Sequence, residues 1–148
     1  MQPGHFYGWP WFYMGANEDP RHAGSRPDLR ARVTVPDLLF RAHSAAIHTT
    51  FYPASLTGKS AFPAEYRGDA FVTLHGSWNR SPRTGYKVVR AILKDGVPTG
   101  EYQDFVTGFV VDDSHVWARP YGIAVLRDGS LLFGDNENNM IWRVTWIG

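Results

Sequence analysis

The sequence predicts an all-β protein built from short antiparallel strands, and three observations support this fold class. Aromatic residues make up 15% of the 148 residues, and 15 Gly and 10 Pro supply frequent turns. The apolar runs are short and end at turn-forming residues, which is typical of strands. No window of the sequence has apolar residues at the spacing of an amphipathic helix.

The first 32 residues differ from the rest of the chain. In residues 4–13 aromatic side chains mix with turn formers, without a period of 2 or 3.6. Residues 16–32 are polar, and their arginines alternate with acidic residues. Mixed charge of this kind is typical of a solvated segment, so we expect residues 16–32 to form a surface loop.

Seven segments beyond residue 33 have the composition of strands. They are rich in apolar and β-branched residues, and turn pairs such as Gly-Asp and Asp-Gly separate several of them. In the last segment polar and apolar side chains alternate, which indicates a half-buried strand. The predicted strands are residues 47–52, 70–74, 86–93, 105–111, 122–126, 131–133 and 140–147.

The predicted strands also repeat along the chain. Residues 68–76 and 85–90 follow the order strand, polar turn, strand, and residues 128–136 and 139–144 follow it again. A repeated sheet unit is typical of a β-propeller, whose blades take roughly 40–45 residues. We therefore expect about three blades of an incomplete propeller. Its unpaired apolar faces would favour self-association; they would carry Phe71, Leu74, Val88, Val89, Leu131 and Phe133.

Composition and motif content exclude several function classes. The net charge of +1 does not predict a nucleic-acid partner. No apolar run reaches the ~18 residues of a membrane span, and the N-terminus does not have the pattern of a signal peptide. The absence of Cys excludes disulfides and thiol nucleophiles. Phosphate-loop, dinucleotide-binding and Gly-x-Ser-x-Gly hydrolase motifs are also missing from the sequence.

Two predicted loops carry side chains suited to ligand binding. The second of them places Arg119 between a Trp-Ala pair and a proline. Guanidinium groups bind carboxylates with two parallel hydrogen bonds and stack on rings, so both loops suit a planar, anionic ligand. The alternative is that these arginines lie on the surface against tryptophans. The first loop follows a predicted strand and contains His75, Trp78, Asn79 and Arg80.

Five motifs together resemble a known family. They are HFYGWP at 5–10, FPAEYRGDAF at 62–71, HGSWNR at 75–80, GYKVVR at 85–90 and WARP at 117–120. In this order they resemble the C-terminal part of the pyrroloquinoline quinone (PQQ)-dependent sugar dehydrogenases of the L-sorbosone/glucose dehydrogenase group. The HGSWNR and GYKVV elements are the most specific. The resemblance covers nearly all of residues 1–148 and implies a six-bladed β-propeller in a periplasmic or secreted protein.

The resemblance implies roles for single residues. PQQ is a planar ortho-quinone with three carboxylates, so its site needs cations and stacking groups. Asn79 and Arg80 correspond to a PQQ-contacting pair in the family, and Arg119 to an arginine that reaches the cofactor from the last blade. Trp78 and His75 flank these positions.

The resemblance also implies a structural calcium ion. Tyr7 and Tyr13 lie near positions whose backbone carbonyls hold that ion in the family, and Asn17 occupies a carboxylate position. The family's catalytic histidine lies in an early blade and matches none of the six histidines here. We therefore assign no catalytic residue and expect the chain alone to be inactive.

The resulting hypothesis is part of a PQQ-dependent dehydrogenase that oxidises a sugar or an aldehyde. Its expected partners are that small substrate and either the missing N-terminal blades or further copies of the chain. The first alternative is a non-catalytic, propeller-like module that binds a sugar or a protein through the same loops. The second is a lactonase-like calcium hydrolase that uses Asp135, Asn136 and Glu137 as ligands.

Overall fold

The computed structural model describes residues 2–148 and divides the chain into two compact units. The first unit is Met1–Leu39 and the second is Phe40–Gly148. Among the described residues, no helix has the length and apolar character needed to cross a membrane.

The first unit contains little regular structure. Strands β1 (Phe12–Tyr13) and β2 (Asn17–Glu18) form a short antiparallel hairpin, and a 3-10 helix, η1, follows at Pro27–Arg32. The segment 16–32 thus contains β2 and η1. Its guanidinium groups pair with neighbouring carboxylates: Arg21 binds Asp19 through Nε at 2.9 Å and Nη2 at 2.6 Å. These side-chain hydrogen bonds hold the pKa of Asp19 below its ordinary value.

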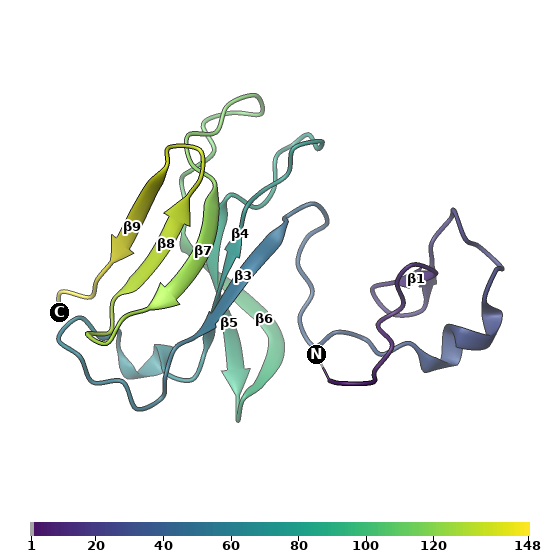
Figure 1. Ribbon diagram of the computed structural model, residues 1–148, viewed down its shortest axis with the longest axis horizontal. Coiled ribbons are helices and arrows are strands. Elements are labelled where there is room, and N and C mark those ends of the chain that lie inside the picture. Colours follow the sequence, from purple (N-terminus) through teal and green to yellow (C-terminus); the bar gives the residue numbers. More distant parts are fainter. Residues whose placement is uncertain (1) are drawn as a thin grey trace. The chain divides into compact units, whose positions relative to one another are not determined.

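The second unit consists of two antiparallel sheets (Figure 1). The four-stranded sheet has the order β3-β4-β5-β6, and the three-stranded sheet has the order β7-β8-β9. A 3-10 helix, η2 (Ala64–Tyr66), precedes β4. The strands are β3 (Ala46–Phe51), β4 (Ala70–Leu74), β5 (Lys87–Lys94), β6 (Val97–Val106), β7 (Pro120–Val125), β8 (Leu131–Asp135) and β9 (Met140–Val144).

One predicted strand, residues 105–111, is largely wrong. The chain instead turns at Asp95 and Gly96, both with positive φ, and returns directly as β6. An Asp-Gly pair in this conformation is a favoured two-residue hairpin turn. Pro98 and Gly100 within β6 resemble strand breakers in the sequence, but β6 is an edge strand with a bulge opposite β5, and such strands tolerate both residue types.

The main core contains side chains from both sheets. Strand β7 contacts β3 and β4, which brings the two sheets together. The opposite face of the four-stranded sheet buries Val72, Leu74 and Val89, and Phe40 and Tyr102 pack against them. Strand β4 is consequently buried along its whole length. The buried residues of the main core are Tyr52, Phe62, Phe71, Tyr86, Val88, Phe109, Ala118, Ile123, Leu131 and Phe133.

The all-β class is confirmed, but the prediction of three propeller blades is wrong. The sheets have two, four and three strands, and residues 2–148 form neither a closed barrel nor a propeller. The repeat in the sequence corresponds to two similar hairpins, β4–β5 and β8–β9, which contribute to one core. The six apolar residues expected on unpaired faces are each at most 3% exposed, because four of them lie in the main core and Leu74 and Val89 are buried on the opposite face of the four-stranded sheet.

Three loops leave the sheets of the second unit at the same end. Loop A (residues 75–86) joins β4 to β5, loop B (residues 107–119) joins β6 to β7, and loop C (residues 136–139) joins β8 to β9. Loops A and B rise above the strands at the top of Figure 1. Because the sheets are antiparallel and share a core, residues far apart in the sequence meet at this end.

Candidate functional site

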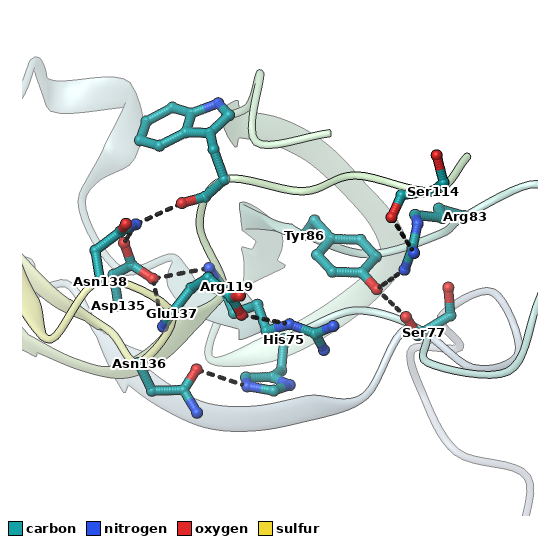
Figure 2. A network of polar contacts seen from close by, with 11 residues as sticks. His75, Ser77, Arg83, Tyr86, Ser114, Arg119, Asp135, Asn136, Glu137 and Asn138 are labelled. Carbon is teal, nitrogen blue, oxygen red and sulfur yellow. Dashed lines mark hydrogen bonds and ion pairs between the residues drawn. The ribbon is translucent and has the colours of Figure 1, made fainter. Parts of the chain in front are cut away.

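Tyr86 lies at the centre of a polar network formed by loops A, B and C (Figure 2). Its side chain is 1% exposed. The hydroxyl donates to the carbonyl of Ser77 and accepts a 2.9 Å hydrogen bond from Arg83 Nη1. A Cβ atom placed on Gly76 would lie 2.5 Å from the Tyr86 ring, so the ring packs directly on the backbone of loop A. Tyr86 thereby fixes the path of this loop.

Arg83 joins loop A to loop B. Its Nε donates to the carbonyl of Asp113 at 2.8 Å, and its Nη2 donates to the carbonyl of Ser114 at 3.0 Å. Together with the Tyr86 contact, these bonds engage all three nitrogens of the guanidinium group. Arg83 therefore has a structural role, because three of its five N–H donors fasten loop A to loop B and to Tyr86.

Arg119 lies at the end of loop B, above the ring of Tyr86. The guanidinium carbon is 5.3 Å from the ring centre, a cation–π distance. Arg119 Nε donates to Glu137 Oε2 at 3.0 Å, and the Arg119 side chain is 22% exposed. Its two Nη groups make no hydrogen bond to the described part of the chain, so they remain available as donors.

Asp135, at the end of β8, is a buried carboxylate that binds several residues of this network. It is 2% exposed, and its Oδ1 accepts hydrogen bonds from the backbone N–H groups of Arg119 and Glu137. Its Oδ2 accepts from the side chains of Asn138 and Trp142. Burial by itself would raise the pKa of Asp135, but these hydrogen bonds outweigh that effect and lower it. The carboxylate therefore remains ionised while it positions Arg119 and Glu137.

His75 connects loop A to loop C. Its Nε2 donates to Asn136 Oδ1 at 2.9 Å, and the Asn136 backbone N–H donates to the carbonyl of Arg119 at 3.3 Å. The structure thus brings His75 and Arg119, two of the five predicted cofactor-binding residues, into one network.

The other three predicted residues follow one another in loop A. The Trp78 side chain is 82% exposed, and Asn79 is also exposed. Arg80 is half-buried: its Nη1 donates to the carbonyl of Ala42 at 3.4 Å, and its Nε is buried with no hydrogen-bond partner in the structure. No carboxylate of residues 2–148 forms a salt bridge with Arg80. A cation with an unsatisfied buried donor beside an exposed indole fits an anionic, planar group.

The predicted calcium ligands Tyr7, Tyr13 and Asn17 all lie in the first unit. The side-chain amide of Asn17 donates to the carbonyls of Tyr13 and Met14, at 3.3 and 3.0 Å. Tyr7 accepts a hydrogen bond from the backbone of Gln2 through its hydroxyl. Calcium sites are built from several outward-facing oxygens that include carboxylates. Here the Asn17 side chain donates to the Tyr13 carbonyl through its nitrogen, and a calcium ion at these residues stays a prediction.

The lactonase-like alternative also lacks a metal centre. The Asp135 carboxylate accepts four hydrogen bonds, Asn136 Oδ1 binds His75, and Glu137 binds Arg119. Among residues 2–148, no group of three or more His, Cys, Asp or Glu side chains has a metal-binding arrangement.

Sequence reasoning missed the residues that hold the site together. Tyr86 lies within the GYKVVR motif, and Arg83 lies between that motif and HGSWNR. Nothing in a strand pattern shows that Tyr86 stacks under Arg119 or that Arg83 binds loop B. The sequence indicates only a metal-ligand role for Glu137, in the lactonase-like alternative. Its pairing with Arg119 joins residues 18 positions apart, and the available signal was the repeat that aligns loops A and C.

Comparisons with known proteins identify related sequences and folds. A family model described as TrAA12-like matches residues 15–146. An uncharacterized protein of Borreliella burgdorferi is 38% identical over 104 residues, which are 70% of this chain and 26% of that protein. The chain thus spans about a quarter of the length of this curated relative.

Two solved structures share the fold at 21% sequence identity. The holo form of the PQQ domain of pyranose dehydrogenase from Coprinopsis cinerea gives a TM-score of 0.69, covering 95% of this chain and 40% of that one. The iodide structure of a Trichoderma reesei protein of Carbohydrate-Active Enzymes Family AA12 gives a TM-score of 0.68. That match covers 95% of this chain and 39% of the other. The chain therefore spans about two fifths of these structures.

Proposed function

The chain belongs to the TrAA12-like family, and from this premise we propose that its loop A and loop B bind PQQ in a quinone-dependent oxidoreductase. The proposed substrate is a sugar or an aldehyde, of the glucose or sorbosone type that the HGSWNR and GYKVV motifs indicate. Two fold relatives support the cofactor and the substrate class by name, one as the PQQ domain of a pyranose dehydrogenase and one as a family of carbohydrate-active enzymes.

The observation that carries the proposal is that Arg80 Nε is buried without a hydrogen-bond partner. A buried donor without a partner is costly, and most buried polar groups in proteins bind another protein group or an ordered water. Arg80 Nε is such a donor, on a guanidinium group that has no carboxylate partner among residues 2–148. A PQQ carboxylate would satisfy both the hydrogen-bonding group and the charge.

The neighbouring side chains offer a flat aromatic surface and further hydrogen-bond donors, which a planar tricarboxylate also requires. The exposed Trp78 indole offers a flat surface for the ring system, and the Asn79 amide adds donors and an acceptor. Arg119 offers two Nη groups for another carboxylate, and its stacking on Tyr86 restricts where they point. When bound, PQQ supplies a two-electron acceptor for the oxidation of an alcohol or an aldehyde. These residues hold and orient it, and none is assigned as an acid or a base.

Isothermal titration calorimetry of the chain with PQQ tests this function. We expect saturable binding of one PQQ per chain, with affinity that falls as salt rises, because the contacts are ionic. Citrate, a tricarboxylate without a ring system, serves as the control and should bind more weakly. Absence of PQQ binding would contradict the proposal. Binding of glucose without PQQ would instead identify the chain as a sugar-binding module.

A further inference from the structure

The ion pair between Arg119 and Glu137 is built into the site by a third residue. Asp135 accepts the backbone N–H of Arg119 at 2.9 Å and that of Glu137 at 3.0 Å. One buried carboxylate thus places the guanidinium group and the acid next to each other. Neither partner is fully buried: the Arg119 side chain is 22% exposed and the Glu137 side chain 46%.

This pair limits what Arg119 offers to a ligand. The Glu137 carboxylate occupies the Nε donor at 3.0 Å and neutralises the charge of the guanidinium group. Asp135, ionised and buried, adds a second negative charge close by. An anion that approaches Arg119 therefore meets an acidic neighbour, in contrast to Arg80, which pairs with no acid of residues 2–148.

The pair is also weak enough to be replaced. Only one hydrogen bond joins the two side chains, whereas a full Arg–carboxylate fork makes two. Ion pairs between partly exposed groups contribute little net stability. A ligand carboxylate that forms such a fork with Nε and one Nη group of Arg119 can therefore displace Glu137 into solvent.

We propose that Glu137 competes with anionic ligands for Arg119 and so lowers the affinity of the site for carboxylates. The inference rests on the proposed function, because it takes PQQ as the anion. Glu137 acts through Arg119 and is a positioning residue. In the free protein it holds the guanidinium group over Tyr86, and in the complex a ligand carboxylate takes its place.

Three variants of the full chain test the competition by PQQ calorimetry. Glu137→Gln removes the charge at nearly constant shape and should bind PQQ about 3- to 10-fold more tightly than wild type. Glu137→Asp keeps the charge and should stay within about 2-fold. Glu101→Gln, on an exposed position in the middle of β6, changes the net charge equally and should leave the affinity unchanged. At high salt the gain in Glu137→Gln should shrink, since salt screens the competing charge.

The outcomes separate this inference from the proposed function. Wild-type binding of PQQ with equal or weaker binding by Glu137→Gln would overturn the competition and leave the function intact. Binding by Glu137→Gln alone would support the competition but contradict the proposed function of the wild-type chain. Absence of binding in every variant would contradict both. Thermal unfolding checks that each variant is folded. If Glu101→Gln also bound PQQ more tightly than wild type, the effect would come from net charge and the competition would be overturned.

Discussion

Replacing Arg80 with Ala is expected to lower the affinity for PQQ about 10- to 150-fold. This corresponds to a loss of roughly 1.5–3 kcal/mol, the contribution of a hydrogen bond to a charged group. The effect should be large because Arg80 has no carboxylate partner in the described chain and its buried Nε lacks an acceptor. Isothermal titration calorimetry of both proteins measures the change directly.

Two further variants make the Arg80 result specific. Arg80→Lys keeps the charge but cannot form a planar fork, so it should restore only part of the affinity. Arg127→Ala removes an equal charge from an exposed turn at the opposite end of β7 and β8, and should bind PQQ as wild type does. Wild-type affinity in Arg80→Ala, or an equal loss in Arg127→Ala, would show that Arg80 does not contact the ligand.

Replacing Gly76 with Ala is expected to lower the free energy of unfolding by about 2–6 kcal/mol. Gly76 has φ +102°, a conformation that costs an L-residue roughly 1–3 kcal/mol. The new Cβ would also lie 2.5 Å from the Tyr86 ring, and overpacking of this kind costs a further 1–3 kcal/mol or so. The ring cannot easily move away, since it is buried and its hydroxyl is bonded to Ser77 and Arg83. Urea denaturation measures the loss.

Gly68→Ala separates the two contributions. Gly68 also has a positive φ, +87°, but a Cβ atom there meets nothing within 4 Å. It should therefore lose only the conformational part, roughly 1–3 kcal/mol. An equal loss in Gly76→Ala and Gly68→Ala would mean that Tyr86 does not pack tightly on loop A and cannot fix its path.

The sequence predicts most strands but not their assembly. Local composition and turn residues are sufficient for strands such as β4 and β8, which are short, apolar and bounded by turns. The propeller prediction relied on a repeat of hairpins, and a repeat does not specify what packs against each sheet. Both faces of β4 are apolar in sequence. In the structure, the three-stranded sheet covers one face, and Phe40 and Tyr102 pack against the other.

The sequence also predicts only part of the candidate site. Residue type identified loop A and Arg119 as ligand-binding candidates, because a guanidinium group next to an indole is chemically distinctive. Contacts between the loops determine which arginine side chains could bind a ligand, and the sequence does not show these contacts. Arg83 resembles Arg80 in sequence, yet its donors bind two carbonyls of loop B and the Tyr86 hydroxyl. Likewise, only the structure shows that the Asn17 amide donates to the carbonyl of Tyr13.

Locating PQQ on the chain by ¹H–¹⁵N NMR titration tests the central claim most directly. We expect the largest shifts at the Trp78 indole N–H, at the side-chain Nε–H groups of Arg80 and Arg119, and at the backbone of loop A. The apolar groove lined by His48, Ala124, Leu132 and Ile141 provides the internal control and should not shift. Shifts confined to that groove or to Met1–Leu39, with loops A and B unchanged, would contradict the assignment of the site.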